Sequence, residues 1–375
     1  MSSGSSTRAP HAEIAGGGFA GLTAAVALRR QGWTVRIHEK GHELRALGAG
    51  IFLWHNGLTV LEAIGAYDDV MEGSVTPPVY ETRIHDTSVS KETFGGLRWR
   101  TMTRPHLHSA LVAAAVREGV DFQMDSEVVA ADPKGSVTLA SGRVLEADLV
   151  VGADGVGSKV RDSLHFKQTR TKSRDGIARF LVHRDKEFIG GDWDNVIDFW
   201  NFAPKVMRIL YVPCNDDYLY LGLMAPREDI DAAQVPINLN VWTDMFPQLT
   251  PALERVARIE DGRSDRYETT VLDSWTKGKV ALIGDAAHAM CPALAQGAGC
   301  GMVNALTLAA AVADPTDVSS SLRGWEQRER PVTDRCQTRS AWFAETRSMS
   351  RGNQFTSEVL ETAKYEALRA AVSVP

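Results

Sequence analysis

The chain has 375 residues, of which 44% are hydrophobic, and it carries a formal net charge of −6 at pH 7. This length allows a large core and two domains. The basic residues are scattered and no DNA- or RNA-binding motif occurs, which argues against a nucleic-acid partner. No run approaches the roughly 18 apolar residues of a spanning helix, so we expect a cytoplasmic protein without a membrane partner.

The first residues and the cysteines add two further expectations. Residues 1–10 are rich in serine and small residues, and we expect a disordered tail. The four cysteines are far apart, with neither a CxxC pair nor a zinc spacing: Cys214, Cys291, Cys300 and Cys336. We therefore expect reduced thiols and no metal site.

The first predicted elements form a β-α-β unit around a glycine-rich loop. A strand over 13–15 precedes the sequence GGGFAG at 16–21, a helix follows over 22–31, and a second strand covers 34–38. Gly16 permits a tight turn, Gly18 lets the backbone approach a pyrophosphate, and Gly21 lets the helix pack closely. The helix N-terminus attracts phosphates.

Glu39 ends this unit, where an acid accepts a hydrogen bond from an adenosine ribose hydroxyl. The loop and Glu39 together predict a dinucleotide site without choosing between NAD and FAD. A purely structural glycine turn is the alternative.

The middle of the chain alternates between two kinds of pattern. Helical periodicity at 57–64 and 104–118 contrasts with short alternating strands at 80–84, 128–145 and across 167–267. The strand over 206–213 places Arg208 on the face of Leu210 and Val212. The next strand, 219–224, places Tyr220 opposite the leucines, and the intervening Cys-Asn-Asp favours a hairpin.

Two apolar strands, 147–151 and 278–285, each run into a glycine-flanked acid. The acids are Asp154, within 152–161, and Asp285, within 284–288. A small-residue helix over 297–313 follows, and the remainder is predicted to be helical with Pro331 interrupting it. Either acidic motif alone could be an ordinary loop.

The whole set of motifs, from the GGGFAG loop to 292–299, resembles the class A flavin-dependent aromatic monooxygenases over about residues 11–345. This resemblance implies an α/β fold, a Rossmann-like FAD-binding domain of the para-hydroxybenzoate hydroxylase type with an inserted mixed β-sheet substrate domain and C-terminal helices. The implied boundaries are 11–75, 100–165 and 270–345 for the FAD domain, 76–99 and 166–269 for the substrate domain, and 346–375 for a C-terminal helical segment.

The resemblance also implies which residues hold FAD. Arg104 is expected on the flavin side, Asp285 at the ribityl chain, and 292–299 beside the isoalloxazine ring. The next helix carries Cys300 and Asn304 where the family often has asparagine and an acid. The implied cofactor residues are Gly16, Gly18, Phe19, Ala20, Gly21, Glu39, Lys40, Arg45, Arg104, Asp154, Gly155, Gly284, Asp285, Pro292, Gly297, Ala298 and Gly299.

Four further stretches, at 52–57, 77–82, 88–94 and 291–296, are similar to the subgroup that acts on 2-methyl-3-hydroxypyridine-5-carboxylate in vitamin B6 catabolism. That subgroup hydroxylates and opens a pyridine ring. The likeness implies a substrate pocket in which Phe52 replaces a tyrosine. Its candidate residues are Phe52, Tyr80, Arg179, Arg208, Tyr220, Cys291 and Pro292.

By the same resemblance, FAD reduced by NADH or NADPH, with NADH favoured, reacts with O2 to give a C4a-hydroperoxide that attacks an electron-rich ring. A heteroaromatic carboxylate substrate requires a cation, and we expect Arg208 first and Arg179 second. A salt bridge away from the pocket is the alternative for both. Tyr80 and Tyr220 would hydrogen-bond the ring hydroxyl, the ring nitrogen or water, the alternative being core packing. His288 is more typical of a structural loop residue than of a base.

Other functions stay open from the sequence. A hydroxylase of a hydroxynicotinate- or salicylate-type acid would keep the ring intact. A flavin halogenase would need a Trp-x-Trp-x-Ile-Pro stretch, which is absent, and a flavin-carrying sensor would oxidise no NADH in response to substrate. A homo-oligomer is compatible with all of these.

Overall fold

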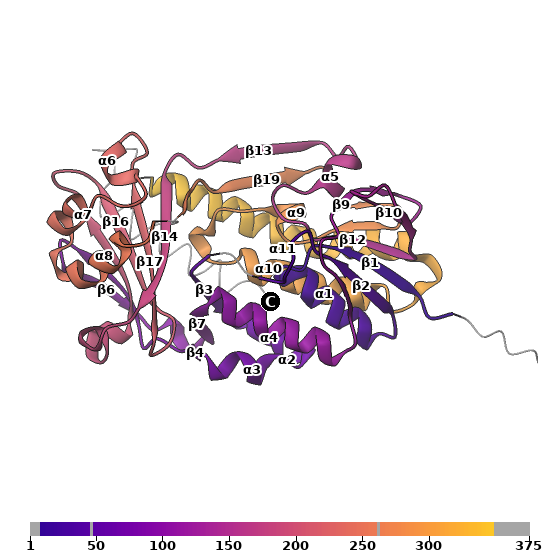
Figure 1. Cartoon of the computed structure of the whole chain (residues 1–375), viewed down its shortest axis with the longest axis horizontal. Helices are drawn as coiled ribbons and strands as arrows, with labels where there is room; N and C mark the ends of the chain where they lie inside the picture. The colour runs from indigo at the N-terminus through magenta and orange to yellow at the C-terminus, as the bar shows by residue number, and fades with distance from the viewer. Residues whose placement is uncertain (1–7, 46–47, 261–262, 349–375) are drawn as a thin grey trace, which may run out of the picture.

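The computed structural model describes residues 8–45, 48–260 and 263–348. Two large sheets organise these residues, with β1, β2 and β12 at one end of Figure 1 and β14, β16 and β17 at the other. A ribbon of β13 and β19 runs between the two ends, and the long helix α11 lies behind it.

The first large sheet has six strands in the order β20-β21-β12-β1-β2-β8, all parallel except the β20–β21 pair. Its central strand β1 places Ile14 opposite Ile37 of β2 and Val151 of β12, and all three are buried. The strands are β1 (His11–Ala15), β2 (Thr34–His38), β8 (Asp121–Gln123), β12 (Leu149–Gly152), β20 (Thr276–Lys277) and β21 (Val280–Leu282).

Helix α1 (Phe19–Arg30) follows the glycine loop and packs against α4 (Arg104–Arg117) and α10 (Gly297–Ala311). Its positions 21–28 are all buried, which is why an alanine- and leucine-rich sequence forms a central helix here. Gly32, with φ 85°, turns the chain into β2. The predicted β-α-β unit is therefore confirmed.

The second large sheet has seven strands in the order β18-β14-β17-β16-β15-β5-β6, antiparallel except for β15 with β5. Alternate residues face opposite layers. Ile209, Tyr211 and Leu221 pack on the helices α6 to α8, whereas Val212 and Tyr220 face the small sheet β3-β7-β4. The predicted faces of the strands at 206–213 and 219–224 are confirmed.

The bounds of these strands and of the other sheets are β3 (Gly50–Trp54), β4 (Ser74–Val75), β5 (Tyr80–Ile84), β6 (Thr87–Glu92), β7 (Trp99–Thr103), β9 (Val128–Asp132), β10 (Ser136–Leu139), β11 (Val144–Glu146), β13 (Gln168–Lys172), β14 (Gly176–His183), β15 (Val196–Asn201), β16 (Met207–Pro213), β17 (Tyr218–Ala225), β18 (Arg263–Asp265) and β19 (Glu268–Leu272). The remaining α-helices are α2 (His55–Ile64), α3 (Tyr67–Glu72), α5 (Lys159–Ser163), α6 (Ile230–Ala233), α7 (Leu239–Met245), α8 (Thr250–Ala257), α9 (Asp285–His288) and α11 (Val318–Thr346). Short 3-10 turns cover Phe94–Gly96, Lys186–Phe188, Gly191–Asp194, Pro247–Leu249, Pro292–Leu294 and Pro315–Asp317.

Two sequence expectations about elements are wrong. The strand expected over 278–285 is only Val280–Leu282, because Gly284 turns the chain into α9 with φ 58°. Pro331 does not interrupt the last helix, because tertiary contacts hold α11 on both sides of it. Before it, Glu326 accepts from the Trp275 backbone N–H (2.9 Å), and after it, Gln337 donates to a carbonyl of β19 (2.7 Å).

The α/β fold predicted from the sequence is confirmed, with a Rossmann-like parallel sheet and a separate mixed sheet. The proposed domain boundaries stay a prediction. Residues 1–7 of the expected tail and 349–375 of the expected C-terminal helix lie outside the described ranges. Within those ranges no single helix is long and apolar enough to cross a bilayer. The helix α10 and the segment Pro315–Thr346 meet that test only together, and they are bent by 96°.

Candidate active site

A cavity of about 1420 Å³ is lined by parts of both large sheets. On one side are the segments that follow the carboxyl ends of β1, β12 and β21, where a parallel α/β sheet commonly binds its ligand. On the other side are the cavity-facing residues of β14, β15, β16 and β17. Segments far apart in the sequence thus line the same cavity.

The glycine loop after β1 has the geometry that its spacing predicts. Gly16 has φ 100°, and a Cβ there would lie 2.5 Å from the Ala153 carbonyl oxygen. A Cβ at Gly21 would lie 2.1 Å from the Gly16 carbonyl oxygen, so the helix packs directly on the loop. Beside Gly18 there is open space to at least 4 Å. This cradle fits a pyrophosphate at the N-terminus of α1.

Glu39 is half-buried beside this loop. Its carboxylate accepts hydrogen bonds from the backbone N–H groups of Gly17 (3.1 Å) and Gly41 (3.0 Å). The acid therefore lies at the loop, as predicted, and it also ties the loop to the end of β2. Lys40 and Arg45 are exposed and do not line the cavity.

Arg104 and Asp285 both line the cavity at the expected flavin side of the cofactor site. The Arg104 guanidinium lies 4.7 Å from the centre of the Phe19 ring. Asp285 faces the cavity at the start of α9. Burial inside the molecule raises the pKa of Asp285, and Arg104 opposes this shift. Burial and the nearby Arg179 lower the pKa of Arg104.

The loop before α10 leaves a polar atom without a partner in the described residues. Gln296 is buried, and its Oε1 accepts from Asn56 (3.0 Å), yet its Nε2 has no hydrogen-bond partner. The free N–H groups of α10 begin at the next residue, and no acidic residue occupies its first turn. Gly297 and Ala298 line the cavity, so the free N–H groups at the start of α10 fit an acceptor-rich flavin nucleotide, whereas Gln296 itself does not line the cavity.

Asp154 has a clear structural partner. Its Oδ2 accepts from the backbone N–H groups of Lys159 (2.8 Å) and Val160 (3.1 Å), which caps α5. Its Oδ1 is buried without a partner among the described residues. Its role toward a nucleotide stays a prediction.

On the opposite wall, Arg208 is paired with a residue that the sequence analysis missed. Its Nε donates to Asp198 Oδ1 (2.6 Å) and its Nη2 donates to Asp198 Oδ2 (3.2 Å). The Tyr80 hydroxyl also donates to Asp198 Oδ2 (3.3 Å). Burial alone would raise the pKa of Asp198, but Arg208 and Arg347 outweigh it, so this pKa lies below its ordinary value.

Arg347, just after α11, is the second partner of Asp198 that the sequence did not reveal. Its Nη2 donates to Asp198 Oδ2 (2.7 Å), and its guanidinium lies 4.5 Å from the Phe343 ring centre and 5.0 Å from that of Trp200. Arg208 lies 4.9 Å from the same Trp200 ring. Two arginines thus share one buried carboxylate.

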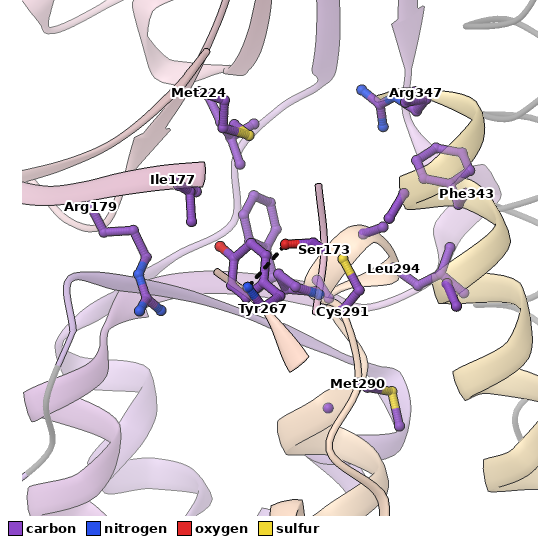
Figure 2. A pocket seen from close by; sticks show the side chains of 18 of the residues that line it. Ser173, Ile177, Arg179, Met224, Tyr267, Met290, Cys291, Leu294, Phe343 and Arg347 are labelled. Atoms are coloured by element: carbon purple, nitrogen blue, oxygen red, sulfur yellow. Dashed lines mark hydrogen bonds between the residues drawn. The ribbon is translucent and has the colours of Figure 1, made fainter. Parts of the chain in front are cut away.

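Arg179 lies at the other side of the pocket, as Figure 2 shows. Its Nη2 donates to Asp265 Oδ2 (2.5 Å), and its guanidinium is 5.7 Å from the centre of the Tyr267 ring. Tyr267 stands near the middle of this view, with its backbone N–H bonded to Ser173 Oγ (3.1 Å). Tyr267 was not among the sequence candidates.

Aromatic side chains form the apolar part of the wall. Phe52 is stacked on Trp99 with ring centres 6.2 Å apart and planes within 8°. Tyr220 packs against Gly50, where a Cβ would lie 2.6 Å from the Tyr220 Cβ, so the seven-stranded sheet approaches β3 closely. Such a wall excludes water from the space beside a planar ligand.

Cys291 and His288 are poor candidates for acid–base work. Burial raises the pKa of the Cys291 thiol to about 11. Burial also lowers the pKa of His288 to about 4, and its Nε2 is 3.0 Å from Asn304 Nδ2. His288 is therefore a neutral, buried ring near neutral pH, which agrees with the structural interpretation.

The structure brings all seven predicted pocket residues to the cavity wall: Phe52, Tyr80, Arg179, Arg208, Tyr220, Cys291 and Pro292. Most predicted cofactor residues line it as well: Gly18, Phe19, Ala20, Arg104, Gly155, Gly284, Asp285, Pro292, Gly297 and Ala298. Those set back from the wall are Gly16, Gly21, Glu39, Lys40, Arg45, Asp154 and Gly299. Their individual roles stay predictions.

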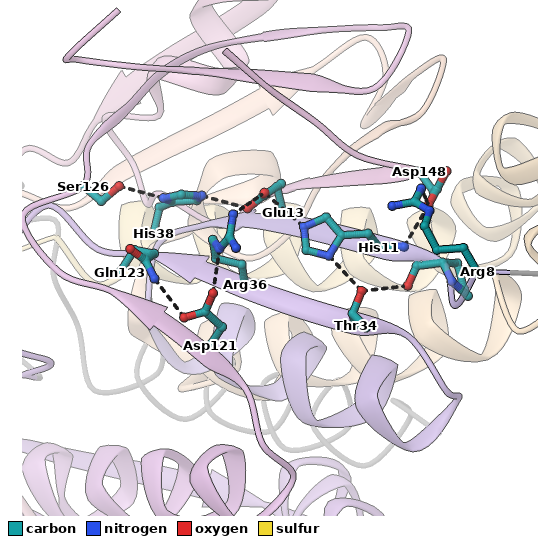
Figure 3. Close-up of polar contacts among 11 residues, drawn as sticks. Arg8, His11, Glu13, Thr34, Arg36, His38, Asp121, Gln123, Ser126 and Asp148 are labelled. Carbon is teal, nitrogen blue, oxygen red and sulfur yellow. Dashed lines mark hydrogen bonds and ion pairs between the residues drawn. The ribbon is translucent and has the colours of Figure 1, made fainter. Parts of the chain in front are cut away.

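A second polar cluster lies away from the cavity, on the six-stranded sheet, and is drawn in Figure 3. Glu13 of β1 is buried and contacts three basic side chains: His38 Nε2 (2.8 Å), His11 Nε2 (3.0 Å) and Arg36 Nη1 (3.2 Å). Burial alone would raise the pKa of Glu13, but His11 and His38 lower it to about 2. Glu13 is therefore ionised under ordinary conditions.

Comparison with known proteins agrees with this geometry. The model of the family described as FAD binding domain matches residues 10–340. The chain belongs to this family. A solved structure, the tetrameric form of 2-methyl-3-hydroxypyridine-5-carboxylic acid oxygenase, is 62% identical, covers 96% of this chain and 98% of its own, and superposes with a TM-score of 0.89.

Two curated relatives extend the comparison. The 2-heptyl-3-hydroxy-4(1H)-quinolone synthase of Mycobacteroides abscessus is 39% identical over 88% of each chain. The 6-hydroxynicotinate 3-monooxygenase of Pseudomonas fluorescens is 25% identical over 81% of this chain and 82% of its own. The protein is thus an FAD-dependent aromatic hydroxylase of the class A flavin monooxygenases, which confirms the family predicted from its motifs.

Proposed function

We propose that this enzyme uses NADH or NADPH, with NADH favoured, and O2 to hydroxylate a hydroxylated pyridine carboxylic acid and to open its ring. The observation that carries the proposal is the 62% identity to 2-methyl-3-hydroxypyridine-5-carboxylic acid oxygenase over nearly all of both chains. That neighbour is tetrameric, and we propose that this chain also forms a homo-oligomer, which sedimentation analysis tests.

In this proposal the cofactor extends from the glycine loop to the loop before α10. The 16–21 loop holds the pyrophosphate, Glu39 accepts from the ribose, and Arg104 and Asp285 lie on the flavin side. When bound, FAD supplies the redox and oxygen chemistry. The protein contributes positioning, charge and exclusion of water.

The cavity-facing side of the seven-stranded sheet binds the substrate in this proposal. Arg208 supplies positive charge for the carboxylate, and Arg179 is the alternative cation. Tyr80 and Tyr220 hydrogen-bond the ring hydroxyl or nitrogen, directly or through water. The Phe52 ring lines the cavity and is backed by Trp99, and it provides an apolar surface for a planar ring. The backbone of Cys291 and Pro292 borders the cavity near the predicted flavin position.

Two alternatives have specific support. Hydroxylation without ring opening would match the 6-hydroxynicotinate 3-monooxygenase relative. An alkylated quinolone without the 3-hydroxyl would match the quinolone synthase relative, which is named for its 3-hydroxylated product, and such a substrate is uncharged. The buried arginines at Asp198 favour an acid over an uncharged ring, because an unpaired cation is costly to bury.

The test is a substrate screen with the FAD-loaded enzyme. Hydroxypyridine carboxylates, 6-hydroxynicotinate and 2-heptyl-4(1H)-quinolone, which lacks the 3-hydroxyl that a hydroxylase would add, are each supplied with NADH in air, and NADH loss and product mass are followed. We expect a pyridine carboxylate to stimulate NADH loss and to yield an acyclic amide. A product with an intact hydroxylated ring supports the first alternative. A response to the quinolone alone contradicts the proposal.

A further inference from the structure

We propose that Arg347, at the end of α11, is the residue that makes this cavity specific for anionic substrates, because its guanidinium binds the substrate carboxylate beside Arg208. This inference rests on the proposed function and names the side chain that recognises the substrate carboxylate. It assigns the role to the helix α11 rather than to the sheet alone.

The first argument is the balance of charge on the cavity wall. Arg179 has its own carboxylate, Asp265, at 2.5 Å. Arg208 and Arg347, by contrast, share the single carboxylate of Asp198. These three side chains together therefore carry one net positive charge. Burial and the neighbouring Arg208 lower the pKa of Arg347.

The second argument is the supply of hydrogen-bond donors. Asp198 already accepts from Arg208, Arg347 and Tyr80. Nevertheless Arg347 Nε is buried and has no hydrogen-bond partner among the described residues. A buried charged donor without an acceptor is costly, so this unmet Nε adds to the need for negative charge beside Arg347.

The third argument is orientation. The Arg347 guanidinium lies against the rings of Phe343 and Trp200 and donates to Asp198. These three interactions together fix the plane of the guanidinium. Figure 2 shows Arg347 and Phe343 on the α11 side of the pocket, away from Arg179. Both Arg347 and Arg208 line the cavity. A fixed guanidinium beside a second one is suited to grip a carboxylate.

The experiment compares an acid with its neutral analogue in the FAD-loaded enzyme. Perturbation of the flavin absorbance measures the Kd of 2-methyl-3-hydroxypyridine-5-carboxylate and of the corresponding 5-carboxamide. In Arg347→Met we expect the Kd of the acid to rise roughly 10- to 100-fold and that of the amide to change less than about threefold. Arg347→Lys keeps the charge and should give an intermediate Kd for the acid.

Arg335→Met, on an exposed position of the same helix, is the matched control and should leave both Kd values unchanged. FAD content and unfolding temperature show whether each variant is folded. Should Arg347→Met lose FAD, the Kd values of Arg347→Lys are used to test the inference instead. An unchanged Kd for the acid, or an equal change for acid and amide, overturns the inference alone. A wild-type enzyme that binds neither compound overturns the proposed function and the inference together.

Discussion

Asp198 shows how single buried charges define the cavity. It lies in β15, where all residues are buried, and it faces the cavity between Val196 and Trp200. Two arginines and a tyrosine satisfy its oxygens. Because buried charges are stable only when they are paired, each member of this group depends on the others.

We predict that Asp198→Asn destabilises the FAD-loaded protein by about 3–5 kcal/mol, because two neighbouring guanidiniums lose their counterion. Urea unfolding monitored by fluorescence measures the change. Asp216→Asn, in an exposed turn, is the control and should change stability by less than about 0.5 kcal/mol. A decrease of less than about 1 kcal/mol in the free energy of unfolding would mean that solvent or another anion already neutralises the positive charge of the two arginines.

We predict that Glu39→Gln weakens FAD binding roughly 10- to 100-fold, because the amide offers one acceptor fewer and no charge to the ribose and to the loop N–H groups. Titration of the apoprotein with FAD, followed by flavin fluorescence, gives the Kd. Glu43→Gln, exposed nearby, should bind FAD like the wild type. If both variants bind FAD with equal affinity, Glu39 does not contribute to FAD binding.

The limits of sequence reasoning are clear at this scale. Arg208 was found because a motif likeness and strand alternation both point to it. Asp198 and Arg347 were missed, since their contact joins residues 149 positions apart. A signal did exist: an aspartate inside the otherwise apolar strand around 196–200 is almost never buried without a partner. Nothing in the sequence named that partner.

At the scale of elements, α11 matters because it carries Arg347 to the cavity despite the proline at its middle. Pro331 lacks the N–H that would bond to the Gln327 carbonyl, yet the helix continues to Thr346. Glu326 contacts Trp275 and Gln337 contacts β19, and these contacts hold the segments of α11 before and after Pro331 in line. Local propensity alone predicted a break, and tertiary packing overrides it.

We predict that Pro331→Ala stabilises the protein by about 1–3 kcal/mol, since it restores a helical hydrogen bond and removes a steric conflict. Chemical denaturation measures the gain. Pro315→Ala, at the first position of a 3-10 turn where proline is tolerated, should give none. A loss of stability would indicate that the proline sets the direction of the helix toward Arg347.

The Glu13 cluster makes the six-stranded sheet sensitive to acid. The pKa of Glu13 is lowered from 4.5 to about 2, so its contribution to stability is full above about pH 4.5 and is lost as the pH falls toward 2. We predict an acid-induced loss on the order of 2 kcal/mol from this group. Glu13→Gln should flatten the stability profile between pH 5 and pH 2, whereas exposed Glu146→Gln should not. Identical profiles would exclude Glu13 as the sensor.

At the scale of the whole molecule, three distant chain segments line one cavity. The loops after β1, β12 and β21 converge only when the sheet is assembled. The order of glycines and acids predicted this convergence, because each motif ends an apolar strand. The position of the inserted sheet relative to that cavity followed from the family resemblance, and periodicity could not provide it.

We predict that FAD stabilises the folded apoprotein by about 2.7 kcal/mol at a concentration 100 times its Kd, because the unfolded chain has no such site. Thermal unfolding with increasing FAD measures the shift. FMN, which lacks the adenylate half, should produce a smaller shift, since it cannot use Glu39. No dependence on FAD would contradict the assignment of the cavity.

The two ends of the described chain lie in different surroundings. Arg8 pairs with Asp148 (3.0 Å) at the amino ends of β1 and β12, opposite the edge that borders the cavity. Arg347, one residue from the last described position, touches the cavity itself. A label attached at residue 8 therefore lies at the edge of the sheet opposite the cavity, whereas a substitution at Arg347 changes the cavity wall itself.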